Sequence, residues 1–197
     1  MLLYDSPESG NCYKVRLLLT QLGTEFAREE VDTSRRDGRE DILGGLNPAL
    51  RVPVLRLDDG RHIAESNAIL WYLAEGTPFI PAERFDRAKT LQWMFFEQYD
   101  HEPYVAVIRH RALHGALDDY PDSEDRRDRG YVALAAMEGH LADREFVVGD
   151  RYSIADISLY AYTHVAHEGG FDLDAYPAVR AWLDRVAQQP GHVTIDD

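Results

Sequence analysis

The sequence SGNCYKVR at residues 9–16 lies between a short apolar run, residues 1–4, and an amphipathic segment that extends to residue 22. Apolar residues recur in that segment at helical spacing: Val15, Leu18, Leu19 and Leu22. The pattern predicts a strand, a short loop and a helix with Ser9 at its N-terminus. Because the first-turn N–H groups of a helix are free and its dipole is positive there, this turn favours a thiolate or another anion. On the residues alone, Ser9 and Asn11 also fit ordinary loop and capping positions.

The composition of the 197-residue chain is typical of a soluble globular protein. Hydrophobic residues make up 45% of it, and no apolar run approaches the roughly 20 residues that a membrane span needs. The single Cys excludes an internal disulfide framework, and the start resembles no secretion signal, so we expect a cytoplasmic protein. The net charge of −14 disfavours nucleic-acid binding. We expect neither nucleic acid nor membrane as a partner.

The order of elements predicts two domains of different class, α/β followed by all-α. Residues 1–76 predict a β-α-β unit followed by β-β-α, which is typical of a thioredoxin-like domain, and residues 77–81 predict a linker with two Pro. Residues 33–46 predict only a loose helix or a mobile segment. Residues 82–197 predict an all-helical bundle, with helices near 82–115, 124–142, 153–167 and 177–188. We expect Pro103 to kink the first of these.

A complete helix start signal lies in the helical half, where residues 153–156 read SIAD. Ser153 and Asp156 have the spacing of a capping box. This pattern favours a structural role for Asp156 over a catalytic one.

Two further local features of the first half are compatible with a ligand site. Pro53 stands inside a predicted strand, which indicates an edge strand, a bulge or a cis peptide bond. Glu65 and Ser66 directly precede a predicted helix, with Ser66 expected as its N-cap. The helix N-terminus suits a carboxylate and Glu65 suits an ammonium, so an amino-acid head group fits both.

Four motifs, in this order along the chain, carry a resemblance to a known family. They are SGN at residues 9–11, NPALRVPVL at 47–55, ESNAI at 65–69 and SIAD at 153–156. With them the chain resembles a cytosolic glutathione S-transferase of the Ser-type, bacterial-like kind. The resemblance implies a thioredoxin-like N-terminal domain, an all-helical C-terminal domain, a homodimer, glutathione as cosubstrate without a metal, and a detoxifying transferase activity.

The resemblance also implies roles for individual residues. Ser9 stabilises the glutathione thiolate, with Asn11 as the neighbouring catalytic polar group. The remaining glutathione-binding positions that it implies are Val52 beside a cis-Pro53 for the cysteinyl backbone, Glu65 and Ser66 for the γ-glutamyl end, Arg51 and Arg39 for the glycine carboxylate, and the partner's Asp100 for the γ-glutamyl ammonium.

The pocket for a small hydrophobic electrophile is harder to place. Candidates are Tyr13, Tyr104 and Arg109, the last two on the first long helix of the second half, although aromatic residues at helical spacing are more often core. Tyr13 is also the second choice as hydroxyl donor to the thiol. Cys12 lies a turn further into the helix than Ser9 and is read as a core residue. Glu97, His101 and Glu102 match no standard metal motif.

Two other functions compete with the conjugation of glutathione to electrophiles. A glutathione-dependent cis-trans isomerase of the maleylacetoacetate type also uses a Ser-containing turn, but Gly10-Asn11 departs from the Ser-Cys that usually follows the Ser there. A non-enzymatic, glutathione-binding regulatory module is the other alternative. The presence of Ser9, Pro53, Glu65 and Ser66 together favours an intact glutathione site.

Overall fold

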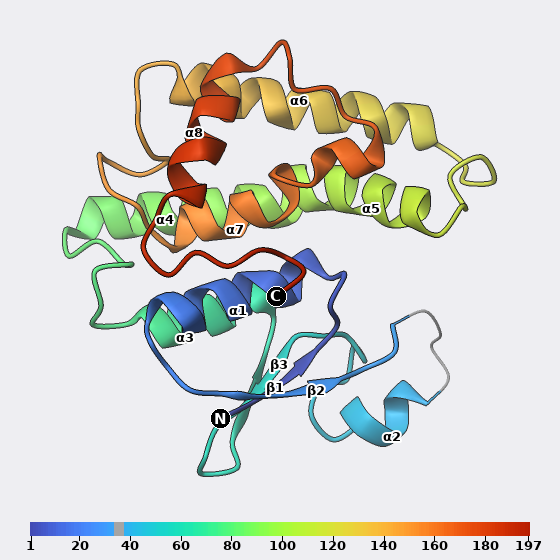
Figure 1. Cartoon of the computed structure of the whole chain (residues 1–197), viewed down its shortest axis with the longest axis vertical. Coiled ribbons are helices and arrows are strands. Elements are labelled where there is room, and N and C mark those ends of the chain that lie inside the picture. The colour runs from blue at the N-terminus through green and yellow to red at the C-terminus, as the bar shows by residue number, and fades with distance from the viewer. Residues whose placement is uncertain (34–37) are drawn as a thin grey trace. The chain divides into compact units, whose positions relative to one another are not determined.

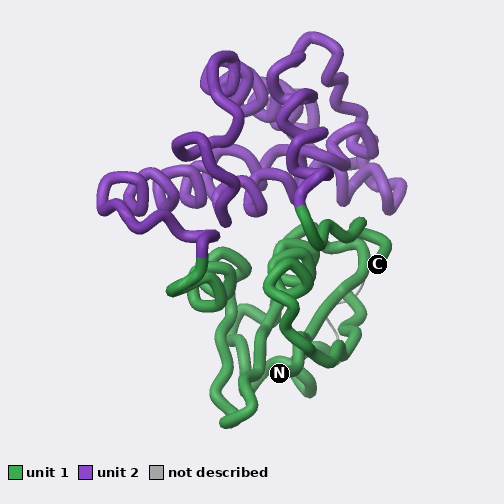
Figure 2. Tube along the Cα trace, turned by 60° about the vertical axis from the view of Figure 1, so that its left-hand side comes forward, with its two compact units in different colours: residues 1–77, 190–197 green, residues 78–189 purple. Residues whose placement is uncertain are grey.

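The computed structural model describes residues 1–33 and 38–197, and it divides into two compact units (Figure 2). Unit 1 comprises residues 1–77 and 190–197, and unit 2 comprises residues 78–189. Sequence analysis assigned the last eight residues to the helical domain, whereas the structure groups them with the first unit.

Unit 1 contains a four-stranded sheet with the strand order β2-β1-β3-β4 (Figure 1). The strands are β1 (Leu2–Asp5), β2 (Ala27–Glu30), β3 (Val54–Arg56) and β4 (His62–Ala64). β1 pairs in parallel with β2 and antiparallel with β3, and β3 and β4 form an antiparallel hairpin. The β-α-β and β-β-α order expected from the sequence is confirmed.

Side chains alternate along β1, so successive residues pack against helices on opposite faces of the sheet. Leu3 packs with Val15, Leu19 and Ile69 from the adjacent helices α1 (Gly10–Gln21) and α3 (Ser66–Ala74). Tyr4 points to the other face and packs with Leu43, the last residue of the short helix α2 (Arg39–Leu43). This helix lies within the segment expected as a loose helix, of which residues 34–37 fall outside the described part.

The last eight residues join unit 1 through backbone carbonyls that accept hydrogen bonds from α1 and β2. The Tyr13 hydroxyl donates to the carbonyl of Val193 at 2.7 Å, and Arg16 Nη2 donates to that of Ile195 at 2.7 Å. Arg28 Nη1 donates to the backbone oxygen of Asp197 at 2.5 Å. This segment of turns and irregular structure has no apolar periodicity, so its partners are set by the fold and not by a local pattern.

Unit 2 is helical. Its elements are α4 (Arg84–Phe96), the π-helical segment η1 (Glu97–His101), α5 (Glu102–Leu113), α6 (Ser123–Leu141), α7 (Ile154–Thr163), the 3₁₀ turn η2 (Ala166–Gly169) and α8 (Pro177–Ala187). The first long helix expected from the sequence is therefore interrupted ahead of Pro103. Proline has no N–H to donate to the preceding turn, and a π turn accommodates the missing bond.

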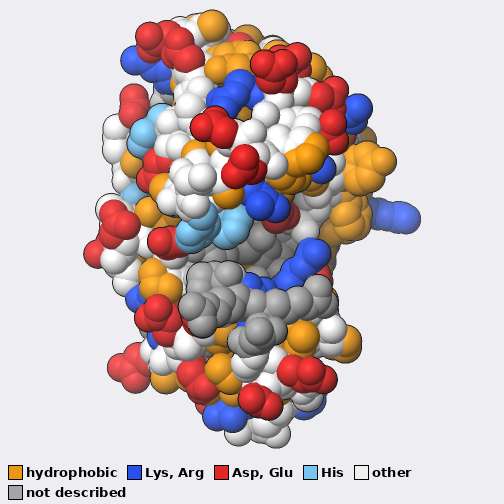
Figure 3. Space-filling view, turned by 90° about the vertical axis from the view of Figure 1, so that its right-hand side faces the viewer, with side chains coloured by type: hydrophobic (Ala, Val, Ile, Leu, Met, Phe, Trp, Pro, Cys, Tyr) orange, Lys and Arg blue, Asp and Glu red, His pale blue; other side chains and the backbone are white. Residues whose placement is uncertain are grey.

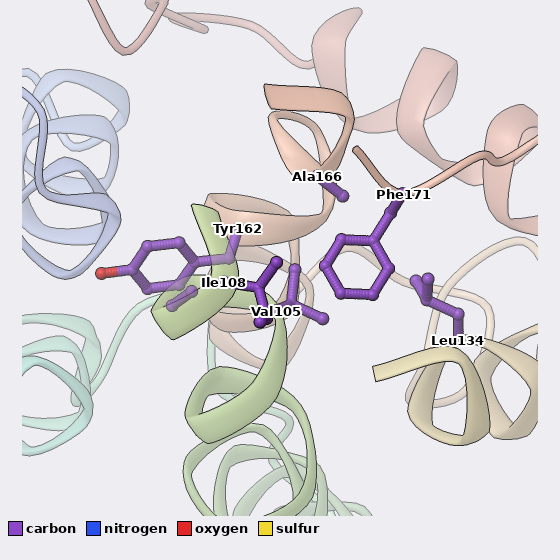
Figure 4. Close-up of a cluster of buried hydrophobic side chains, with 7 residues drawn as sticks. Val105, Ile108, Leu134, Tyr162, Ala166 and Phe171 are labelled. Carbon is purple, nitrogen blue, oxygen red and sulfur yellow. The ribbon is translucent and has the colours of Figure 1, made fainter. Parts of the chain in front are cut away.

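One buried apolar cluster of unit 2 contains Phe171, whose ring lies beside Val105, Ala166 and Leu134 (Figure 4). Gly130 of α6 makes this packing possible, since a Cβ built there would lie 2.6 Å from Phe171 Cε1. A side chain at position 130 would have to displace the ring.

The capping box predicted at the start of α7 is confirmed. Ser153 Oγ accepts from the Ala155 N–H at 3.3 Å, and Asp156 Oδ2 accepts from the Ser153 N–H at 2.9 Å. Asp156 Oδ1 also accepts from the Val147 N–H at 3.0 Å and from Trp182 Nε1 at 2.9 Å. The carboxylate is fully buried and joins α7 to α8 and to the preceding loop, which makes it a structural residue.

The surface carries acidic side chains over much of the face in Figure 3, in keeping with the net charge of −14. Within residues 1–33 and 38–197, none of the helices combines the length and the apolar character that crossing a bilayer requires.

Candidate functional site

Ser9 occupies the N-cap of α1, as predicted, with its side chain half-buried. Its Oγ accepts from the Cys12 N–H at 3.3 Å, and its own N–H donates to the Ser6 carbonyl at 3.0 Å. A hydroxyl that accepts in this way still has its proton to donate. The first turn of α1 contains no acidic residue, and the positive end of the helix dipole favours an anion there.

Asn11, Lys14 and Ser66 form a polar cluster that joins α1 to the start of α3. Lys14 Nζ donates to Asn11 Oδ1 at 2.8 Å and lies 3.5 Å from Ser66 Oγ. The Ser66 hydroxyl donates to the same Asn11 oxygen at 3.0 Å. Sequence reasoning identified Asn11 and Ser66 separately and missed Lys14, whose helical position gave no sign that it would be buried.

The start of α3 differs from the expectation in one residue. Glu65 is the N-cap and Ser66 is the first helical residue, so the Ser66 hydroxyl bonds to Asn11 instead of capping its own helix. Glu65 has a φ of 69°, in the left-handed region that a residue with a side chain adopts only under constraint. Its side chain is exposed beside the N–H groups of the first turn.

The loop before β3 contains the cis peptide bond between Val52 and Pro53, one of the alternatives considered for this Pro. Buried Asn47 shapes the loop, because its Nδ2 donates to the Arg51 carbonyl at 2.9 Å and its Oδ1 accepts from the Ala49 N–H at 3.0 Å. Sequence reasoning gave Asn47 no role, although Asn before Pro is a signal for a turn of this kind.

The two arginines expected at the glycine carboxylate lie in different surroundings. Arg39 donates to the backbone carbonyls of Thr33 and of Leu50, the latter at 3.5 Å. Its guanidinium therefore holds two backbone segments together beside the loop. Arg51 follows Leu50 directly and its side chain is exposed, which suits a residue that meets an anion from solvent.

Tyr13 and Cys12 are fully buried. The Tyr13 hydroxyl donates to the Val193 carbonyl and lies 3.3 Å from His192 Nε2, so its proton is directed to the last eight residues. Burial, together with the negative charge of Asp5, raises the pKa of the Cys12 thiol to about 12. The thiol of Cys12 is thus protonated at neutral pH, in agreement with its interpretation as a core residue.

An ion-pair cluster around the buried carboxylate of Asp5 supports the Ser9 turn. The carboxylate of Asp5, at the end of β1, accepts from Arg16 Nη1 at 2.7 Å and from Arg28 Nε at 2.7 Å. Arg16 also donates to the Pro7 carbonyl at 3.2 Å. This cluster fixes the path of residues 5–9, and sequence reasoning did not identify it because its members are far apart along the chain.

The candidates on α5 face different neighbours. Tyr104 borders a surface pocket of about 450 Å³ whose lining includes Tyr99 and Arg129, and its hydroxyl accepts from Arg129 Nη1 at 3.3 Å. Arg109 is buried, and its Nε donates to Glu168 at 2.6 Å. The structure therefore does not bring Tyr104 and Arg109 together within unit 2.

The residues considered as metal ligands make hydrogen bonds to other side chains. Ser158 donates to Glu97 at 3.2 Å, Gln98 donates to Glu102 at 2.6 Å, and Thr163 Oγ1 lies 3.0 Å from His101 Nε2. Among the described residues, no group of three or more His, Cys, Asp or Glu is placed to hold a metal ion.

Both parts of the chain match known domain families. Residues 8–75 match the family model described as the N-terminal domain of glutathione S-transferase, and residues 93–190 match that of its C-terminal domain. A crystal structure of glutathione S-transferase from Pseudomonas fluorescens Pf-5 is 46% identical with a TM-score of 0.96, over 100% of this chain and 98% of that one.

Curated relatives carry several functional names. A maleylacetoacetate isomerase of Rhizobium meliloti is 31% identical, over 93% of this chain and 89% of the relative. The disulfide-bond oxidoreductase YfcG of Escherichia coli is 29% identical, over 95% and 90%.

Proposed function

Because the chain belongs to the glutathione S-transferase family, we propose that it joins the glutathione thiolate to small electrophiles, with Ser9 and Asn11 as the groups that act on the thiol. The observation that carries this proposal is the 3.0 Å bond from Ser66 to Asn11. It holds the N-termini of α1 and α3 side by side, so one tripeptide can present its thiol to the first and its γ-glutamyl carboxylate to the second. Both helix ends favour negative charge.

The other glutathione contacts follow from the same placement. The exposed side chain of Glu65 pairs with the γ-glutamyl ammonium, and the backbone of Val52 pairs with that of the cysteinyl residue. Arg51 binds the glycine carboxylate, and Arg39 supports the loop through Leu50. Backbone and charge-assisted contacts of this kind fix the ligand along its length and leave the sulfur at Ser9.

To activate glutathione, the site has to lower the pKa of its thiol. A free cysteine thiol has a pKa of about 8.5, and each unit by which the site lowers it requires about 1.4 kcal/mol of preference for the thiolate. A hydroxyl donor together with the N–H groups of a helix N-terminus supplies about one to two units. Orientation of the thiolate toward the electrophile supplies the rest of the rate acceleration.

The proposed enzyme is a cytoplasmic homodimer that acts in detoxification. Support for a dimer comes from large apolar side chains that are exposed on unit 2, namely Phe85, Phe95, Tyr99 and Val132. The partner's Asp100 then reaches the γ-glutamyl ammonium. Tyr104 borders a surface pocket and is a better candidate for electrophile contact than Tyr13 or Arg109, which are both buried. Light scattering gives the mass in solution, and a monomer would contradict the dimer and the role of Asp100.

The function is tested by retention on immobilised glutathione, followed by a chromogenic halobenzene conjugation assay. We expect specific elution with free glutathione and turnover that Ser9→Ala reduces. Binding without turnover would favour the regulatory module, and isomerisation of a maleyl substrate in place of conjugation would favour the isomerase. Failure to bind glutathione would contradict every reading of this site.

A further inference from the structure

A lysine side chain is buried beside Asn11 and Ser66, two residues of the proposed glutathione site. Lys14 has no exposed surface, and its Nζ lies 2.8 Å from Asn11 Oδ1. The only other lysine of the chain is Lys89, which donates a solvent-exposed hydrogen bond to Gln92 in α4. Burial of an ammonium is costly unless it is hydrogen-bonded, so the bond from Lys14 to Asn11 is a strong constraint on both side chains.

The lysine determines which way the Asn11 amide faces. An ammonium group only donates hydrogen bonds, so the amide atom beside it must be the oxygen. The Ser66 hydroxyl donates to the same oxygen at 3.0 Å, which makes two donors on Oδ1. With Oδ1 held between Lys14 and Ser66, the amide nitrogen Nδ2 faces the opposite way.

The two orientations of this amide have opposite effects on a thiolate. An N–H donor stabilises the negative sulfur and lowers the pKa of the thiol, whereas a carbonyl oxygen repels it and raises that pKa. An asparagine without a fixed orientation can present either edge. The charge-assisted bond from Lys14 favours the orientation in which the donor edge is directed away from the lysine.

We propose that Lys14 is a positioning residue for the glutathione thiol: it fixes the Asn11 amide so that Nδ2 donates to the thiolate beside Ser9. This inference rests on the proposed function of the same site. Lys14 itself does not touch the substrate, and it acts through Asn11.

The test compares Lys14→Met with the matched control Lys89→Met. The measurements are the pH dependence of kcat/KM for glutathione and the ultraviolet absorbance of the bound thiolate. We expect Lys14→Met to raise the apparent thiol pKa by about one unit, which lowers the rate about tenfold below that pKa and less than about twofold well above it. Lys89→Met should match the wild type, and Lys14→Arg should restore most of the low pKa.

A purely structural role would give a different result. Lys14→Met would then lower the amount of folded protein at every pH and leave the thiol pKa unchanged, which would overturn the proposal. In an Asn11→Ala background the proposal predicts that Lys14→Met has no further effect on the thiol pKa, because the two residues act as one unit. Full additivity would contradict it.

A second variant keeps the test decisive if Lys14→Met does not fold. Asn11→Asp retains an oxygen acceptor for Lys14 and Ser66 but removes the N–H donor, so we expect a raised thiol pKa. An unchanged pKa in Asn11→Asp would overturn the proposal. The failure of the proposed function is distinguishable, since the wild type itself would then show no bound thiolate.

Discussion

Two serine-capped helix N-termini, one in each unit, use the same cap for opposite purposes. At the start of α7, Ser153 and Asp156 close the helix end reciprocally, and the buried carboxylate also bonds to Val147 and Trp182. At the start of α1, Ser9 accepts a single bond from the Cys12 N–H, and no carboxylate stands in the first turn. The third residue after the cap makes the difference. An acidic residue there closes the end of α7, whereas Cys12 provides no carboxylate of its own to close the end of α1.

The largest expected effect is on stability, from Asp156→Ala. Four buried donors would lose their acceptor: the N–H groups of Val147 and Ser153, the Ser153 hydroxyl and Trp182 Nε1. We expect a loss of about 3–5 kcal/mol in the free energy of unfolding, measured by denaturation at pH 7. The control is Glu83→Ala, which removes an exposed cap that bonds Phe85 and Asp86 and should cost about 1 kcal/mol. Equal losses of unfolding free energy in the two variants would contradict the structural role of Asp156.

The same carboxyl predicts a pH dependence of stability. Burial raises the pKa of Asp156 from 3.8 to about 6 in the folded protein. The folded state therefore holds this proton more tightly than the unfolded chain, and the contribution to stability is present below about pH 4 and lost as the pH rises to about 6. The difference of about two pKa units corresponds to about 3 kcal/mol.

This dependence is measured as the difference in Tm between the wild type and Asp156→Asn across that range. Asn cannot titrate, so the wild-type curve should decline relative to the variant from about pH 4 to about pH 6. Parallel curves would refute the link between Asp156 protonation and stability.

Ser9→Ala should change chemistry more than stability. We expect glutathione affinity close to that of the wild type, turnover near neutral pH lower by about tenfold, and a loss of about 1 kcal/mol in stability from the missing cap. The matched control is Ser153→Ala, which should lower the free energy of unfolding by a similar amount and leave the pH–rate profile unchanged. Ser9→Thr retains a hydroxyl and should preserve activity. An unchanged rate and pH profile in Ser9→Ala would remove Ser9 from the mechanism.

The smallest effect is expected at Cys12. Since burial holds the pKa of its thiol at about 12, a thiol reagent should fail to label Cys12 in the folded protein at neutral pH and should label it on unfolding. Cys12→Ala should change the conjugation rate less than about twofold. Rapid labelling of the native protein, or a large loss of rate in the variant, would indicate a reactive cysteine instead.

Local patterns were sufficient to predict much of this molecule. The helical spacing after Ser9 predicted α1 and its cap, SIAD predicted the capping box of α7, and the order of short elements predicted the thioredoxin-like sheet. These features depend on neighbours within about four residues, which a sequence displays directly. The sequence did not predict the π-helical segment η1, although the kink expected at Pro103 marked the place where the long helix changes.

The sequence by itself determined the class of each unit, the two serine caps and the residues with the chemistry for a thiol site. Only the tertiary structure decided what those residues contact. It buried Lys14 against Asn11, moved Ser66 from a cap to a partner of α1, and placed residues 190–197 against Tyr13 and Arg16. Ser66 and Asn11 are 55 residues apart and Tyr13 and Val193 are 180 apart, so these contacts leave no periodic signal and form only when the elements pack.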